Sequence, residues 1–337
     1  MRATINDVAE RAGVSIKTVS RVTNNEPSVR QHTREKVLKA VEALNYTPNA
    51  AARNLAGTKS FAIAFVYDNP NAYYVIDMQN GILSACNENG YELLIHPCNS
   101  KSHDINAEIT EMIRRSRVAG LVLTPPFSEM PSVIETLEQL DVKFVRVLSG
   151  SGESDGLSPC VFIDDNHAAY AITEHLIDQG HTEIGFLCGD KEHNSSQERL
   201  KGYKAALKKN SIKIDRSLIL KGAYSFESGV EGAKKLLSRE QKPTAIFASN
   251  DEIAAGALFA ARLMSFDIPE QLSITGFEDS PFSRQTWPKL TTAQQPTTTI
   301  AHSATKLLIE ATRNPEKQGE YDIFLPELII RDSTGTA

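Results

Sequence analysis

From residue 61 onward the chain alternates between short apolar runs and amphipathic stretches, and this alternation restricts its fold more than any other feature. Eight runs have the length and composition of buried strands: 61–67, 91–97, 119–125, 143–148, 160–164, 183–189, 245–249 and 272–277. Between most of them lie segments with helical periodicity, such as 78–89, 105–116, 200–210 and 252–264. Continuous apolar strands that alternate with helices are typical of parallel sheets covered on both faces.

Eight strands are too many for one comfortable sheet, so we expect two doubly wound lobes. A Gly/Ser-rich loop at 149–159 suggests that the chain changes lobe near 155–163, although the same composition fits an ordinary surface loop. After Leu290 a helix over 298–312 is followed by a strand-like segment, 321–333, as expected if the chain recrosses between the lobes. We therefore predict an α/β core over 60–335, with lobe 1 formed by 60–161 and 290–320 and lobe 2 by 162–289 and 321–335.

The first sixty residues have a different pattern. In residues 4–24 apolar or small side chains recur at helical spacing, and Gly13 interrupts them once. Thr4 and Ser15 stand just before the helical segments on either side of Gly13, where a hydroxyl can accept from unpaired backbone N–H groups. This predicts a helix-turn-helix, with the polar residues of the second helix facing outward. Taken alone, the pattern also fits an ordinary helical hairpin with a solvated polar face.

A third helix is expected over 33–44, with Val37, Leu38, Val41 and Leu44 on one apolar stripe. We predict that the three helices form a small headpiece over 1–46, followed by a hinge helix and linker over 47–59. The alanine-rich segment 49–56 is too short to be stable as an isolated helix. Such a segment is suited to become helical when it binds a partner.

The charge distribution supports this division. Residues 1–60 hold ten Lys and Arg against five Asp and Glu, whereas the whole chain has a net charge of −6. A basic module attached to an acidic body fits binding to a polyanion such as DNA, although a basic surface can also be only a solvated face. The four cysteines are widely separated and the N-terminus has no apolar signal segment, so we expect a reduced, cytoplasmic protein with buried thiols.

The segments 4–24 and 33–57 closely resemble the headpiece and hinge of the lac repressor and galactose repressor family of bacterial transcription factors. The resemblance implies phosphate or positioning contacts to DNA from Thr4, Ser15, Thr18, Ser20, Asn24 and Thr33. It implies base reading by Ile16, Lys17 and Arg21, and a minor-groove wedge at Leu55 with Asn49, Ala52 and Arg53 beside it. Lys17 stands at a variable position, so the operator sequence is not implied.

The remaining chain resembles the periplasmic-binding-protein-like core of the same family, which has a ligand cleft between two lobes. Independently of the resemblance, polar side chains gather in the loops that follow the predicted strands, where open parallel sheets bind ligands. The resemblance implies contacts to a sugar or related effector from residues of both lobes: Tyr73, Tyr74, His193, Ser195, Arg199, Tyr224, Asn250 and Glu278. Glu278 departs from the aspartate usual in the family.

Each of these residues also has a structural interpretation. Asn250 could only cap a helix, Arg199 could form a surface salt bridge with Glu198 or Glu192, and the two tyrosines could be core residues. An enzyme that uses a carboxylate pair from 164–165 or 278–279 is a second class of function, but the chain has no GxSxG, HExxH, P-loop or GxGxxG motif. The eight histidines have no metal-ligand spacing, so no metal or cofactor is expected.

We therefore expect a homodimeric DNA-binding transcriptional regulator, most simply a repressor, whose operator affinity is controlled by a small effector. A regulator with a degenerate cleft that works without a ligand stays open as an alternative. A transport binding protein would share the core but would need a signal peptide and no headpiece.

Overall fold

The computed structural model describes residues 3–23, 28–46, 60–69, 71–152, 154–314 and 319–337. By its internal contacts the chain divides into two compact units, residues 1–61 and 62–337. We call them the headpiece and the core and describe each by itself.

The headpiece contains the expected helix-turn-helix. Helix α1 (Ile5–Ala12) begins with a capping box in which the Thr4 amide donates to the Asp7 carboxylate at 2.7 Å and the Thr4 hydroxyl accepts from the Asp7 amide. It ends at Gly13, whose φ of 64° is in the left-handed region that favours glycine. Helix α2 (Ile16–Thr23) follows directly, and α3 (Gln31–Ala43) begins two residues earlier than predicted.

Six buried side chains form the core of the headpiece: Val8, Ala9, Val19, Val22, Val37 and Ala40. Val41 and Leu44 pack against them as expected. Leu38 does not, since 49% of it is exposed. The apolar stripe of α3 follows Val37, Ala40, Val41 and Leu44, because residues three and four apart share a helix face whereas neighbouring residues do not.

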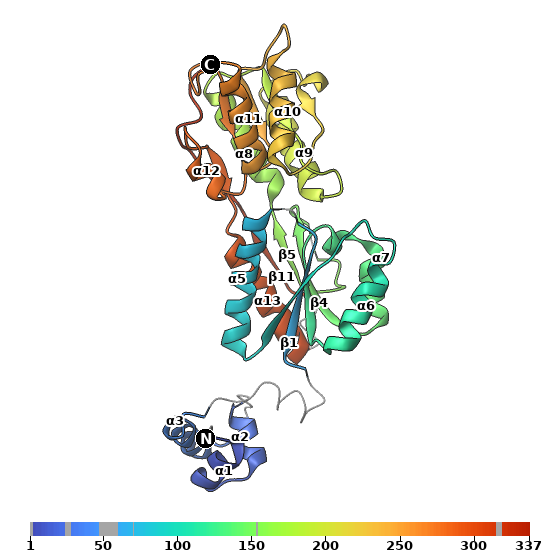
Figure 1. Cartoon of the computed structure of the whole chain (residues 1–337), viewed down its shortest axis with the longest axis vertical. Helices are drawn as coiled ribbons and strands as arrows, with labels where there is room; N and C mark the ends of the chain where they lie inside the picture. Colours follow the sequence, from blue (N-terminus) through green and yellow to red (C-terminus); the bar gives the residue numbers. More distant parts are fainter. Residues whose placement is uncertain (1–2, 24–27, 47–59, 70, 153, 315–318) are drawn as a thin grey trace. The chain divides into compact units, whose positions relative to one another are not determined.

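The first lobe of the core contains a six-stranded parallel sheet with the order β11-β5-β4-β3-β1-β2. Its strands are β1 (Ala62–Tyr67), β2 (Glu92–Pro97), β3 (Gly120–Leu123), β4 (Lys143–Ser149), β5 (Cys160–Ile163) and β11 (Tyr321–Phe324). Helices α5 (Ala72–Asn89) and α13 (Thr297–Arg313) cover one face, and α6 (Ile105–Ser116) and α7 (Pro131–Gln139) cover the other (Figure 1).

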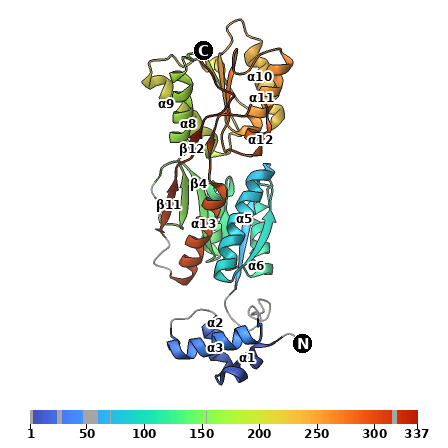
Figure 2. The same ribbon diagram turned by 90° about the vertical axis from the view of Figure 1, so that its left-hand side faces the viewer.

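The second lobe contains a four-stranded parallel sheet with the order β7-β6-β8-β9. Its strands are β6 (Ile184–Leu187), β7 (Ile219–Leu220), β8 (Ala245–Ala248) and β9 (Ser273–Thr275). Helices α8 (Asp165–Asp178) and α9 (Asn194–Lys209) pack on one face, and α10 (Phe226–Leu237) and α11 (Asp251–Leu263) on the other (Figure 2). The short α12 (Pro281–Gln285) follows β9, and β10 (Thr292–Gln294) pairs antiparallel with β12 (Glu327–Ile329).

The chain passes between the lobes after β5, between β10 and α13, and between β11 and β12. Two details differ from the predicted lobe boundaries. The whole of β5 lies in the first sheet, so the first passage falls at Asp164 rather than at residue 161. Strand β11, which we assigned to lobe 2, pairs with β5 and belongs to lobe 1. The alternation of apolar residues in this segment predicts a strand, but it does not predict which sheet the strand joins.

No helix in the described part of the chain is long and apolar enough to cross a membrane. The four cysteines are free; Cys86 and Cys160 are buried as expected, whereas Cys98 and Cys188 are partly exposed.

Candidate functional site

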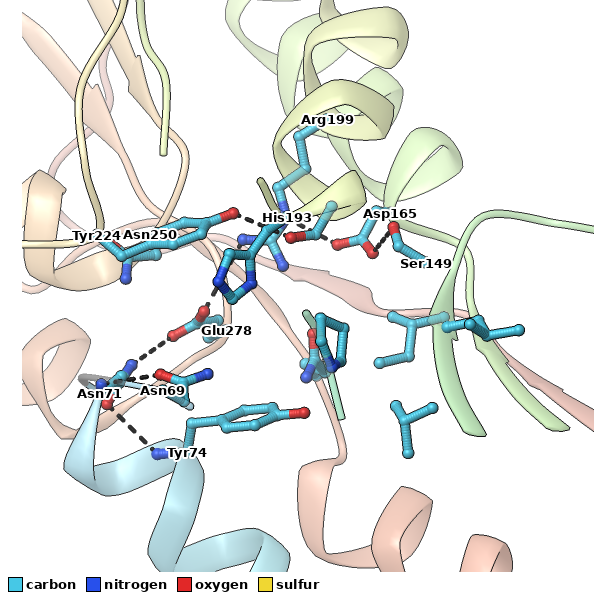
Figure 3. Close-up of a pocket in the computed structure, with 16 residues that line it drawn as sticks. Asn69, Asn71, Tyr74, Ser149, Asp165, His193, Arg199, Tyr224, Asn250 and Glu278 are labelled. Atoms are coloured by element: carbon cyan, nitrogen blue, oxygen red, sulfur yellow. Dashed lines mark hydrogen bonds and ion pairs between the residues drawn. The ribbon is translucent and has the colours of Figure 1, made fainter. Parts of the chain in front are cut away.

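A pocket opens between the two lobes, at the carboxyl ends of several strands (Figure 3). Its cavity volume is only about 50 Å³. The pocket is therefore nearly filled by its own side chains. Sixteen residues line it: Asn69, Asn71, Tyr74, Pro125, Val147, Leu148, Ser149, Ile163, Asp165, His193, Ser195, Arg199, Tyr224, Asn250, Glu278 and Gln295.

Arg199 is the central cation of this pocket. It lies on α9 and is only 3% exposed. Its Nε donates to Oδ1 of Asp165 at 2.7 Å and its Nη1 donates to the carbonyl of Ser249 at 2.5 Å. The guanidinium carbon lies 3.7 Å from the centroid of the Phe277 ring, a cation–π contact. The alternative interpretation of Arg199 as a surface salt bridge with Glu198 or Glu192 is wrong.

Asp165 is the partner that holds Arg199 in place. It is fully buried at the start of α8, and Ser149 of β4 donates a short hydrogen bond to its second oxygen. Burial raises the pKa of Asp165, and the charge of Arg199 opposes that rise. Its neighbour Asp164 instead caps α8 by accepting from the amide of His167 at 2.9 Å. The two adjacent carboxylates therefore have separate structural partners and do not form a hydrolytic pair.

Glu278 faces Arg199 from the loop after β9. Its Oε1 is 3.8 Å from Nη1 of Arg199, and its Oε2 accepts from Nδ2 of Asn71 at 2.9 Å. Burial raises the pKa of Glu278 to about 8, against the effect of Arg199. Its neighbour Asp279 is bonded elsewhere, to Arg284 at 2.9 Å and Arg331 at 2.6 Å. The side chains of Glu278 and Asp279 are thus largely buried, and they do not converge on one point.

An aromatic wall closes the lobe 2 side of the pocket. The buried Tyr224 accepts from Oγ of Ser196 at 3.0 Å, and its hydroxyl is 3.0 Å from Oγ of Ser195. The His193 ring meets the Tyr224 ring edge-on at 5.6 Å between centroids. Burial lowers the pKa of His193, so its neutral form is favoured at neutral pH.

Asn250 caps a helix and also lines the pocket. Its Oδ1 accepts from the amide of Ile253 at 2.9 Å and caps α11. Its Nδ2 is buried and has no hydrogen-bond partner among the described residues. An unsatisfied buried donor costs about 1 to 3 kcal/mol, which a ligand acceptor in the pocket would recover.

Lobe 1 contributes Tyr74 and two asparagines. Tyr74 lines the pocket from the first turn of α5, and Asn71 caps that helix by accepting from the amides of Tyr73 and Tyr74. Tyr73 does not line the pocket. It lines a neighbouring depression shared with Asp77 and Arg284, and its ring meets that of Phe282 edge-on at 5.6 Å.

Seven of the eight predicted effector contacts thus line one pocket, and Tyr73 lies beside it. Nine further lining residues were not among the predicted effector contacts: Asn69, Asn71, Pro125, Val147, Leu148, Ser149, Ile163, Asp165 and Gln295. The rule that carboxyl ends of parallel strands converge could have found several of them, because Ser149 and Ile163 end β4 and β5 and Asn69 follows β1.

The outer surface of α2 in the headpiece presents the expected readers. Ile16 is 51% exposed, and Lys17 and Arg21 are exposed on the same helix. The amide of Thr18 donates to Oγ of Ser15 at 3.2 Å, which fixes the start of the helix. Thr4 is exposed and Ser20 and Thr33 are half-buried. Five predicted contacts lie outside the described residues: Asn24, Asn49, Ala52, Arg53 and Leu55.

Comparison with known proteins gives a consistent result. Residues 4–49 match the model of the bacterial regulatory proteins of the lacI family, and residues 173–334 match the periplasmic binding protein-like domain. The HTH-type transcriptional regulator DegA of Bacillus subtilis (strain 168) is 34% identical over 99% of this chain and 98% of DegA.

Two solved structures are similar over nearly the whole chain. The lac repressor dimer bound to operator and the anti-inducer ONPF is 25% identical, with a TM-score of 0.77 over 99% of this chain and 100% of that one. The complex of the transcriptional regulator CelR with cellobiose is 26% identical, with a TM-score of 0.75 over 98% and 100%. With the headpiece, the two-lobed core and full-length relatives in agreement, the chain belongs to the lacI family of bacterial regulatory proteins, and it is a DNA-binding transcriptional regulator and not an enzyme.

Proposed function

We propose that this protein is a repressor whose operator affinity is set by an uncharged polyhydroxy effector, a sugar or a related metabolite, bound in the pocket between the lobes. The proposal rests on one observation: Arg199 and Glu278 of lobe 2 and Asn71 of lobe 1 line the same pocket and contact one another there. A ligand bound there touches both lobes. It can change their separation by as much as its affinity for the two arrangements differs.

The chemistry of the pocket supports a ligand with several hydroxyl groups. The Nδ2 of Asn250 is a donor in need of an acceptor, and the carboxyl groups of Asp165 and Glu278 offer acceptor oxygens. Tyr74 and Tyr224 offer aromatic faces for the apolar side of a sugar ring. Arg199 is already bonded to Asp165 and Ser249, so a free cation for a phosphate or carboxylate is missing among the described lining residues.

The proposed DNA contacts are those of the sequence analysis. Ile16, Lys17 and Arg21 would read bases from α2, while Thr4, Ser15, Thr18, Ser20 and Thr33 would position the headpiece on phosphates. The hinge contacts of Asn24, Asn49, Ala52, Arg53 and Leu55 rest on the sequence resemblance. Because operator DNA is in the cytoplasm of a bacterium, we place the protein there.

We propose a homodimer, which would bring two headpieces onto a pseudo-palindromic operator. Large apolar side chains stay exposed on three elements of the core: Ile76 and Leu83 on α5, Ile95 on β2, and Phe259 and Leu263 on α11. If these side chains form one contiguous surface, that surface is suited to a protein interface.

Thermal denaturation of the full-length chain against a panel of sugars, with cellobiose included, tests the effector. A pocket ligand raises the melting temperature by mass action and changes the operator affinity in the same concentration range. A sugar that raises the melting temperature but leaves operator affinity unchanged would contradict control by the pocket.

One observation favours a second candidate, a regulator that needs no ligand. The pocket is nearly filled in this structure, and Arg199 already donates two hydrogen bonds to protein groups. If that function is correct, operator affinity does not respond to metabolites from a cell extract. The substitution Asn250→Leu then leaves operator affinity unchanged.

A further inference from the structure

A group of three potential metal ligands lies at the edge of lobe 1, outside the effector pocket. His96 and Cys98 stand at the carboxyl end of β2, and Glu108 lies in α6. One imidazole nitrogen, the Cys98 sulfur and one Glu108 oxygen are all within 4.8 Å of one another. None of the three lines the pocket between the lobes.

Local structure explains why the three side chains meet. Residues two apart on a strand point to the same face, so His96 and Cys98 both face α6. The amide of Cys98 donates to the carbonyl of Tyr67 at 2.9 Å, which extends the pairing of β2 with β1 to this residue. Glu108 follows Ile105 by one turn, and Ile105 is buried in the cluster against which Cys98 packs. Two rigid elements therefore hold the three ligands.

The spacing fits a tetrahedral metal ion. Bonds of about 2.0 to 2.3 Å from zinc to nitrogen, oxygen and sulfur place the ligand atoms about 3.3 to 3.6 Å apart. The Nε2 of His96 lies 3.5 Å from Oε1 of Glu108. The Cys98 sulfur, which lies within 4.8 Å of the other two ligand atoms, can reach the same spacing by rotation of its short side chain.

The His96 nitrogen is the least satisfied atom of the group. Its Nε2 is buried and has no hydrogen-bond partner among the described residues, and it lies 3.5 Å from Oε1 of Glu108. The Glu108 side chain is 42% exposed, which leaves a way for an ion to reach the group and for water to complete its coordination. An imidazole, a thiol and a carboxylate together are the ligand set of a borderline-soft divalent ion.

We propose that His96, Cys98 and Glu108 bind one zinc-class divalent cation per chain, with water at the fourth position. The site clamps the end of β2 to α6 and needs neither the effector nor operator DNA. It is therefore independent of the function proposed above.

Cobalt(II) titration of the full-length, chelator-treated protein tests the site directly. We expect one equivalent per chain to give the thiolate-to-cobalt band in the near ultraviolet and the visible bands of tetrahedral cobalt, and zinc to displace it. Cys98→Ser and His96→Gln should abolish the bands. Glu108→Gln, a change at a partly exposed position, should weaken binding, because a neutral amide replaces a charged oxygen ligand.

Two matched variants control for adventitious binding. Cys188→Ser removes another partly exposed thiol, and His103→Gln removes an exposed imidazole from the loop between β2 and α6. Both should bind cobalt as the wild type does. Absence of the bands in the wild type at stoichiometric cobalt, or their survival in Cys98→Ser, overturns the proposal.

Discussion

The side-chain amide of Asn71 donates from Nδ2 to Oε2 of Glu278 at 2.9 Å, and this bond joins the start of α5 in lobe 1 to the loop after β9 in lobe 2. The same asparagine caps α5 through its oxygen. Glu278 is held with a φ of 102°, in the left-handed region that a side chain rarely adopts. Because this bond links a helix cap in lobe 1 to a strained loop residue in lobe 2, a ligand in the pocket that breaks it would change how the lobes close.

Replacing Asn71 with Ser separates these two roles. Serine still caps a helix, so we expect the free energy of unfolding to change by less than about 1 kcal/mol. Loss of the amide donor removes a hydrogen bond to the Glu278 carboxyl group, worth about 0.5 to 1.5 kcal/mol, from the contact between the lobes. Small-angle X-ray scattering should show a larger radius of gyration. Asn89→Ser at the other end of α5 is the control, and equal scattering from both variants would contradict the role of the bond.

The raised pKa of Glu278 predicts a specific pH dependence. With a pKa of about 8 in the folded protein against 4.5 when unperturbed, the folded state binds the proton more tightly. Stability from this residue is therefore complete below about pH 4.5 and is lost as the pH rises toward 8. The variant Glu278→Gln has no carboxyl group to titrate at this position, so it does not lose this part of its stability as the pH rises. Melting temperatures of both proteins between pH 5 and 8 should converge at the acidic end, and parallel curves would refute the shift.

Truncation of Arg199 should destabilise the core. Arg199→Ala leaves the buried Asp165 without its counter-charge, and breaking a buried pair in this way costs about 3 to 5 kcal/mol. The double variant Arg199→Met with Asp165→Leu removes both charges and should recover most of that loss. Urea unfolding of Arg199→Met, Asp165→Leu and the double variant measures the coupling between the two residues. Additive losses would show that the two residues do not stabilise each other.

Substitution of Arg21 tests the DNA-reading surface. If its guanidinium reads guanine in a major groove, Arg21→Ala costs about 1 to 3 kcal/mol of operator affinity and relaxes the preference at one base pair. Lys39→Ala, an equal loss of charge from the exposed face of α3, should change affinity little at the same salt concentration. Unaltered sequence preference in Arg21→Ala, measured by selection from randomised operators, would remove Arg21 from the set of base readers.

Local sequence patterns determined the elements of this protein. The capping box of Thr4 and Asp7 and the left-handed turn at Gly13 involve residues close in the chain, so the helix-turn-helix could be predicted from their spacing. The eight apolar runs likewise became strands of two parallel sheets, because strand periodicity and burial are properties of a short segment. The polar loops of the pocket followed from the rule for strand ends.

Tertiary structure decided which distant segments became partners. Asp165 meets Arg199 from 34 positions away, and Asn71 meets Glu278 from 207 positions away, so no spacing rule relates either pair. Strand β11 joined β5 rather than lobe 2, and His96, Cys98 and Glu108 came together only because β2 packs beside α6. Periodicity reports which face of an element is buried. The partner of that face depends on how the chain crosses between lobes, a global property set by packing the whole core.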